Sequence, residues 1–135
     1  RLIDGMQAMP RTQAEKIVTE LGMDTAILNK QMNSLSGGQR QLIAFAMATL
    51  LIPKVLLLDE PTAALDPQAA TKLLKHAARF IKQHKITTLL ITHDPHIALS
   101  MGNKIWVLEN GRITKQFTAQ DKKTIHPDQL IGHID

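Results

Sequence analysis

The chain has 135 residues, of which 44% are hydrophobic, it contains no cysteine, and its formal net charge is +4. This composition is typical of one globular domain with a sizeable core, and it excludes disulfide frameworks and cysteine-based metal sites. The basic residues are scattered and the only aromatic residues are three Phe and one Trp, so we expect no nucleic-acid partner. The longest apolar run, residues 42–52, is too short to span a bilayer. Because the first residue is Arg, we also expect that the chain was cut from something longer.

Hydrophobic periodicity and the positions of Gly and Pro predict a helical N-terminal part followed by alternating strands and helices. Residues 55–58 are four consecutive apolar residues, as in a strand of a parallel sheet that is buried on both faces. We therefore predict an α/β fold with a parallel core. In chain order, the predicted elements are helices at 12–21, 25–28 and 37–51, a strand at 55–58, a helix at 67–83, a strand at 86–92, a short helix at 95–101, a β-hairpin at 104–117 and a short helix at 127–131.

Local signals predict how several of these elements begin and end. Thr12 and Glu15 have the spacing of a capping box, and Gly22 stands where a C-terminal cap is expected. Asp66 precedes a proline and is expected to cap the helix at 67–83. The Asn110-Gly111 pair suits a type I′ turn in the hairpin.

Two carboxylates and a histidine follow the predicted strands at their carboxyl ends. Asp59 and Glu60 end the first strand, and His93 follows the second. Ligands bind beyond these strand ends in parallel α/β sheets. Asp59 could hold Mg²⁺ near nucleotide phosphates, Glu60 could act as a general base, and His93 could donate to a γ-phosphate. A solvated carboxylate pair and an ordinary turn histidine are the alternatives.

Ser36, Gly37 and Gly38 stand at the start of the helix predicted over residues 37–51. Glycine allows backbone N–H groups to approach a ligand closely, the helix dipole favours an anion, and the serine hydroxyl adds a donor. The segment is therefore suited to phosphate. Taken alone, a flexible glycine-rich helix start without a ligand explains it more simply.

The combination of three motifs changes this balance. The stretches "LSGGQRQ" at 35–41, "VLLLDEPTAALD" at 55–66 and "LLITHD" at 89–94, in this order, closely resemble the ATP-binding-cassette (ABC) ATPase family. The resemblance extends from residue 12 to about residue 118. It implies a P-loop NTPase fold of the ABC type, of which this chain would be the C-terminal half.

The resemblance also implies a role for each motif, with ATP and Mg²⁺ as cofactors. Two ATPase domains would pair head to tail, so that the signature motif of one contacts ATP held by the other. The implied roles are Mg²⁺ binding for Asp59, catalysis for Glu60 and His93, a D-loop dimer contact for Asp66, and ATP binding in trans for the signature residues Ser36, Gly37, Gly38 and Gln39.

The same resemblance implies three segments and a set of partners. Residues 1–34 would end the helical subdomain, residues 35–118 would form the C-terminal part of the ATPase core, and residues 119–135 would be a tail. The implied partners are a second ATPase subunit, a transmembrane permease subunit and a substrate-binding protein. The subunit would be peripheral, on the cytoplasmic face of a bacterial cell membrane.

Three family features have no match in these 135 residues. Walker A requires G-x-x-x-x-G-K-[ST], and none of the seven glycines is followed by lysine. The Q-loop and the adenine-stacking aromatic of the family have no counterpart either. We therefore expect an ABC-type ATPase only when the cassette is complete, and an isolated chain that exposes an unpaired sheet edge and binds ATP weakly, without useful turnover.

Within the family, the motifs are similar to those of ATPase subunits of amino-acid-type uptake systems, including tryptophan or tyrosine importers. The Gly102-Asn103 pair and the tail "AQDKKTIHPDQLI" contribute to this similarity. Two alternatives stay open. One is a soluble ABC ATPase without a membrane partner, although such proteins usually carry long insertions or tandem cassettes that this sequence does not show. The other is a truncated, non-catalytic cassette that donates its signature motif in trans to an intact partner.

Overall fold

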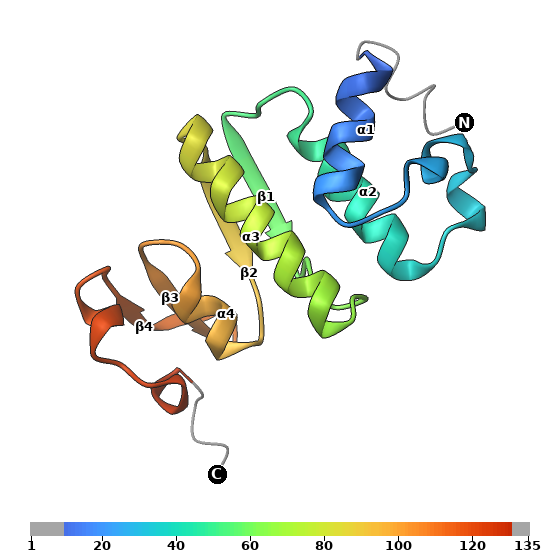
Figure 1. Cartoon of the computed structure of the whole chain (residues 1–135). Coiled ribbons are helices and arrows are strands. Elements are labelled where there is room, and N and C mark those ends of the chain that lie inside the picture. The colour runs from blue at the N-terminus through green and yellow to red at the C-terminus, as the bar shows by residue number, and fades with distance from the viewer. Residues whose placement is uncertain (1–9, 131–135) are drawn as a thin grey trace. The chain divides into compact units, whose positions relative to one another are not determined.

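The computed structural model describes residues 10–130 and divides the chain into two compact units, with the division between Leu89 and Leu90 (Figure 1). None of the helices in the described part is both long and apolar enough to cross a membrane. In chain order, the elements are α1 (Arg11–Glu20), η2 (Thr25–Asn29), η3 (Met32–Ser34), α2 (Gly37–Thr49), β1 (Val55–Asp59), α3 (Pro67–His84), β2 (Thr87–Ile91), α4 (Pro95–Ser100), β3 (Ile105–Glu109), β4 (Arg112–Phe117), η4 (Asp121–Lys123) and η5 (Pro127–Gln129).

The helices and strands agree with most of the predicted elements, and their bounds differ by a few residues. The helix predicted over 37–51 is α2, which ends at Thr49. The helical piece predicted at 25–28 is the 3-10 helix η2, and a second 3-10 helix, η3, was not predicted. The helix predicted at 127–131 is the single 3-10 turn η5, and residue 131 itself lies outside the described residues.

The predicted capping box at the start of the first helix is wrong. Helix α1 begins after Pro10 and has no side-chain cap, and the Glu15 carboxylate accepts a hydrogen bond from Arg11 Nε at 2.8 Å. Residues four apart lie on the same helix face, so Arg11 reaches Glu15 and directs its carboxylate along the helix. The predicted end is confirmed, because Gly22 has the left-handed φ of +80° that suits glycine after a helix.

The helical part of the first unit has its own apolar core, in which α1 packs beside α2 (Figure 1). Val18 of α1, Leu28 of η2 and Ile43 of α2 are fully or almost fully buried. Burying each such side chain contributes about 1.5–3 kcal/mol. The start of α2 is therefore anchored on a packed helical layer.

Strands β1 and β2 are hydrogen-bonded neighbours and run in the same direction, with α3 across one face of β1 (Figure 1). The prediction that residues 55–58 are buried on both faces is wrong. Leu56 and Leu58 are buried, whereas Val55 and Leu57 are 58% and 69% exposed. Successive strand residues point to opposite faces, and among the described residues nothing covers the face that carries Val55 and Leu57.

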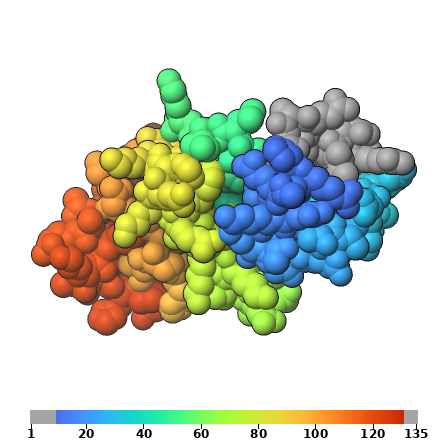
Figure 2. Space-filling model, turned by 45° about the horizontal axis from the view of Figure 1, so that its top comes forward, coloured from blue at the N-terminus to red at the C-terminus, as the bar shows by residue number. Residues whose placement is uncertain are grey.

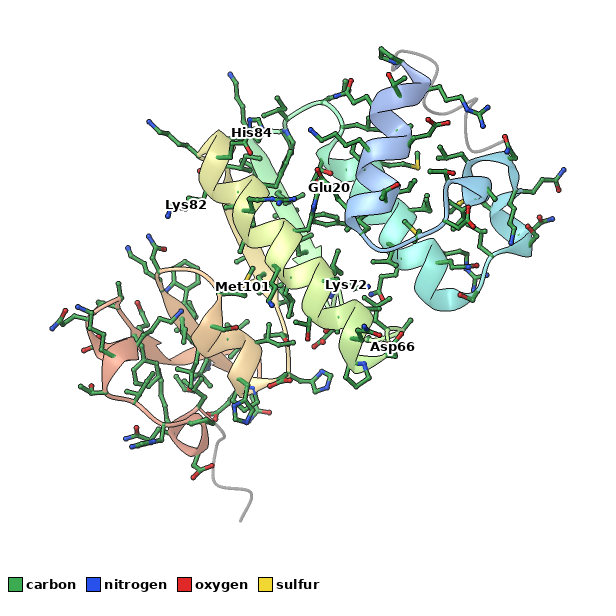
Figure 3. The ribbon with its side chains drawn as sticks, in the orientation of Figure 1. Glu20, Asp66, Lys72, Lys82, His84 and Met101 are labelled. Carbon is green, nitrogen blue, oxygen red and sulfur yellow. The ribbon has the colours of Figure 1, made fainter. Side chains whose placement is uncertain are left out.

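Helix α3 starts and ends as the sequence indicates. Asp66 Oδ1 accepts hydrogen bonds from the backbone N–H of Gln68 and of Ala69, both at 3.0 Å, so it is the predicted N-cap. The helix ends at Lys85, which has a left-handed φ of +52°. Asp66 and His84 lie at opposite ends of α3 (Figure 3).

A buried polar contact joins the three helices of the first unit. His76 of α3 is buried, and its ring meets the ring of Phe45 of α2 edge to face, with 5.9 Å between centroids. Its Nδ1 lies 3.2 Å from Oε2 of Glu20 on α1, and the same carboxylate oxygen lies 2.9 Å from Arg79 Nη2. The surfaces of α1 and α3 meet here (Figure 2), and Glu20 points toward α3 (Figure 3).

The second unit contains the predicted β-hairpin. Strands β3 and β4 pair antiparallel, and the turn residues Asn110 and Gly111 have φ values of +51° and +75°, as a type I′ turn requires. Lys122 Nζ donates to the backbone carbonyl oxygens of Met101 and Gly102, which ties the C-terminal segment to the end of α4. Burial lowers the pKa of Lys122.

We expect the stability of the folded protein to fall in mild acid, because His76 is buried at the junction of α1 and α3. Burial lowers the pKa of His76 below its ordinary value of 6.5, opposed by Glu20 and assisted by Arg79. Because the unfolded chain then binds more protons than the folded one, the free energy of unfolding falls as the pH drops through the pKa that His76 has in the unfolded chain. We therefore expect the melting temperature of the full-length protein, measured by thermal unfolding, to fall between about pH 8 and about pH 5.5. The fall should be steeper for the wild type than for His76→Gln.

The control for this measurement is His96→Gln, which changes an exposed histidine of α4 and should keep the wild-type pH dependence. Parallel curves for the wild type and His76→Gln would contradict the expectation.

Candidate functional site

The start of α2 is a closed capping box. Ser36 is the N-cap, its Oγ accepts a hydrogen bond from Gln39 N, and Gln39 Oε1 accepts one from Ser36 N, both at 3.1 Å. Ser36 and Gly37 are exposed, and no acidic residue lies in the first turn. The Gln39 side chain, assigned to ATP in trans from the sequence, is therefore occupied in closing the helix end.

This helix start fits a phosphate group chemically. The Ser36 hydroxyl accepts in the capping box but keeps its own proton, which it can donate. The N–H groups at a helix N-terminus and the helix dipole favour an anion, and an exposed glycine admits close approach. The residues present thus form an exposed set of donors.

The two carboxylates at the end of β1 differ in their surroundings. Asp59 is exposed and is the last residue of the strand, whereas Glu60 is half-buried and has a left-handed φ of +44°. The exposed Asp59 carboxylate offers the hard oxygen ligand that Mg²⁺ prefers. Among residues 10–130, no three His, Asp or Glu side chains are grouped so that they could hold a metal ion. A magnesium ion at Asp59 would therefore take its other ligands from outside residues 10–130, and phosphate oxygens and water are suited to this.

The first turn of α2 lies directly on the turn that follows β1. A Cβ atom on Gly38 would come within 2.9 Å of the Ala64 carbonyl oxygen. Three residues further along the helix, Gln41 Nε2 donates to the Glu60 carbonyl oxygen at 2.8 Å, and Gln41 Oε1 accepts from Ala64 N at 3.1 Å. The structure therefore brings the predicted phosphate-binding segment together with the turn that carries Glu60.

Sequence reasoning gave no role to Gln41, although it stands in the quoted motif. The signal that was available is its spacing. Gly38 and Gln41 are three residues apart in a predicted helix, so they share one face and meet the same neighbour. Which neighbour they meet depends on a turn about twenty residues away in the chain.

His93 belongs to the second unit, where it is exposed and follows β2. The adjacent Asp94 caps α4 by accepting hydrogen bonds from the backbone N–H of His96 at 2.8 Å and of Ile97 at 3.4 Å. The Asp94 N–H in turn donates to Thr92 Oγ1 at 3.1 Å. The segment that holds His93 is thus a hydrogen-bonded turn, as predicted.

An open hollow of about 340 Å³ lies over the junction of α1 and α3. The residues that line it include none of those predicted for phosphate or metal. They are Glu20, Lys72, Lys75, His76 and Arg79.

Comparison with known proteins identifies relatives of the chain. Residues 6–63 match the family model described as "ABC transporter". The chain is 36% identical to the Fe(3+) ions import ATP-binding protein FbpC of Mesorhizobium japonicum, over 96% of this chain and 37% of that protein. It is 35% identical to the tyrosine transport ATP-binding protein of Clostridioides difficile, over 77% of this chain and 41% of that protein. The chain therefore spans less than half the length of these curated relatives.

Solved structures show the same fold. A dimeric ATP-binding cassette in a post-hydrolysis state, bound to ADP and Pi, matches with a TM-score of 0.72 and 28% sequence identity, over 80% of this chain and 46% of that chain. The predicted P-loop NTPase fold of the ABC type is confirmed for the part of the cassette that the chain covers.

We expect Gly38→Ala to destabilise the protein, because the new methyl group would meet the backbone carbonyl of Ala64, which cannot rotate away. Overpacking of this kind lowers the free energy of unfolding by about 1–3 kcal/mol. The better helix propensity of alanine offsets at most about 1 kcal/mol of this loss. Denaturant unfolding of the full-length protein without nucleotide measures the difference.

Gly37→Ala is the matched control, because its Cβ would lie an ordinary 3.7 Å from the Ala64 side chain. Its stability should equal or slightly exceed that of the wild type. Equal stability of the two variants would contradict the close contact at Gly38.

Proposed function

We propose that this chain carries part of the ATP-binding domain of an ABC transporter and supplies the signature and Walker B elements of an ATP-hydrolysing subunit in a bacterial import system. The strongest support is the direct contact between the glycine-rich start of α2 and the turn after β1. It sets the phosphate-binding donors of α2, which serve the nucleotide of a second subunit in this proposal, against the turn that carries Glu60, the proposed base for the chain's own nucleotide. Import is the activity named for the relatives from Mesorhizobium japonicum and Bacillus licheniformis.

In this proposal each strand-end residue has a distinct task. Asp59 binds the magnesium ion, because it is the exposed carboxylate at the strand end. Glu60 accepts a proton from the attacking water, and His93 donates to a phosphate oxygen. When bound, ATP would supply the phosphoryl group, and the magnesium ion would neutralise part of its charge.

The signature residues serve a nucleotide held by a second subunit. Ser36 donates its hydroxyl proton, and Gly37 and Gly38 present backbone N–H groups at the positive end of α2. Gln39 contributes by closing the capping box that orients Ser36. Asp66, the N-cap of α3, lies in the D-loop that contacts that subunit.

We further propose the organisation and partners that this role requires. Residues 1–34 end the helical subdomain, 35–118 belong to the ATPase core, and 119–135 form the tail. The partners are a second ATPase subunit, a transmembrane permease and a substrate-binding protein, with the assembly on the cytoplasmic face of the membrane. Amino acids are the proposed cargo, supported by the tyrosine and methionine transport of two relatives, although iron and sulfonate transport are named for others.

We expect Glu60→Gln in the full-length protein to abolish ATP hydrolysis while ATP binding persists. The amide is nearly the same size as the carboxylate but cannot accept the proton, and loss of a general base costs about 10²–10⁴-fold in kcat. Steady-state phosphate release and binding of a fluorescent ATP analogue measure the two effects. The control is Glu15→Gln, a half-buried carboxylate on α1 that pairs with Arg11. Unchanged turnover of Glu60→Gln would exclude Glu60 as the base.

The 135-residue chain by itself should bind ATP weakly and turn over none, because it contains no G-x-x-x-x-G-K-[ST] segment. Isothermal titration with a non-hydrolysable ATP analogue tests this expectation. Tight binding with one nucleotide per chain would overturn it.

A further inference from the structure

Gln41 holds both ends of the turn that carries Glu60. We propose that Gln41 is a positioning residue, whose side-chain amide fixes the backbone between residues 60 and 64 so that the Glu60 carboxylate is presented for proton transfer. This inference rests on the proposed function, in which Glu60 is the general base. It adds a residue that never touches the nucleotide but sets the geometry of one that acts on water.

The geometry of Gln41 is that of a two-point clamp. Its Nε2 donates to the carbonyl oxygen of Glu60 at 2.8 Å, and its Oε1 accepts from the N–H of Ala64 at 3.1 Å. One planar amide therefore satisfies a donor and an acceptor four residues apart in the turn. The side chain is half-buried and its stem is part of α2, so the clamp is attached to a rigid element.

The backbone at Glu60 needs such a restraint. Its φ of +44° lies in the left-handed region, which non-glycine residues occupy only when their surroundings impose it. The direction of the Cα–Cβ bond follows from the backbone angles, so relaxation of this residue would turn the carboxylate away. The Glu60 carbonyl oxygen also accepts from Ala63 N at 3.1 Å, but that bond lies within the turn and cannot set its position on the helix.

The clamp also links Glu60 to the proposed phosphate-binding segment. Gly38 and Gln41 lie on one face of the first two turns of α2, and both contact the turn after β1. Ser36 caps the same helix. A displacement of the helix start would therefore be passed to Glu60 through Gln41.

The experiment compares three variants of the full-length protein. Gln41→Met keeps the length of the side chain and removes both hydrogen bonds. Gln41→Glu keeps an acceptor for the Ala64 N–H but places a carboxylate oxygen against the Glu60 carbonyl. Gln83→Glu, an exposed residue of α3, makes the same change of charge away from the turn and should behave as the wild type.

The expected result is a fall in kcat of about 10- to 100-fold for Gln41→Met and Gln41→Glu, with KM for Mg-ATP within about twofold of the wild type, because small misplacements of a catalytic group have effects of this size. The pH profile supplies the second readout. A protonated glutamic acid has one donor and one acceptor, as the amide has, so the activity of Gln41→Glu relative to the wild type should rise as the pH falls from about 7 to about 5, toward the ordinary pKa of a glutamic acid. The relative activity of Gln41→Met should not change.

Three outcomes would overturn the proposal: unchanged kcat in both Gln41 variants, a rise in KM without a fall in kcat, and a loss of activity that only parallels the loss of folded protein in thermal unfolding. Glu60→Gln is measured alongside to separate the two proposals. If Glu60→Gln loses hydrolysis and the Gln41 variants keep it, the function stands and the positioning role fails. If the wild type does not hydrolyse ATP, both fail.

Discussion

The close approach of the first turn of α2 to the turn after β1 determines how the proposed site is assembled. At Gly38 the backbone of the turn lies so near the helix that a methyl group would collide with a carbonyl oxygen. Three residues later the space is wide enough for a glutamine, whose amide bonds both ends of the turn. A small residue followed by a long polar one on a single helix face thus matches the shape of its neighbour. This match brings the helix start against the turn that begins at Glu60, although the two are about twenty residues apart in the chain.

The helical layer behind this contact gives α2 a fixed position. Its apolar face packs with α1 and η2, and its Phe45 meets the buried His76 of α3. His76 in turn shares Glu20 with Arg79, so a polar junction connects α1 to α3. A buried imidazole is tolerated here because it has a carboxylate partner and a ring to pack against. The position of α2, and with it that of Gln41, is thereby coupled to α1 and α3.

Most of the elements could be predicted because their signals are local. Asp66 and Pro67 begin α3, and Gly22 follows α1 with a left-handed φ. Asn110 and Gly111 form the turn of the hairpin. Each of these features could be predicted from the residue itself and its immediate neighbours in the chain. The capping box at Thr12 and Glu15 failed for an equally local reason, since the helix begins at Arg11, Thr12 lies inside it, and the Glu15 carboxylate pairs with Arg11. The burial of the first strand failed for a different reason. Four consecutive apolar residues at 55–58 are compatible with burial of both strand faces. Burial itself depends on what lies against each face, and α3 covers only one of them.

The sequence by itself determined which chemical groups the proposed site contains: the glycines and serine at a helix start, the two carboxylates after an apolar strand, and their order along the chain, from which the confirmed fold class was predicted. Helix caps, turns and strand periods depend on neighbouring residues, so they can be read directly from the chain. Only the tertiary structure decided that Gln41 reaches Glu60 and Ala64, that Glu60 has a left-handed backbone, and that Gly38 is needed for close packing. These features depend on the distance between a helix and a distant turn, which is set by the packing of the whole helical layer and not by any local stretch of sequence.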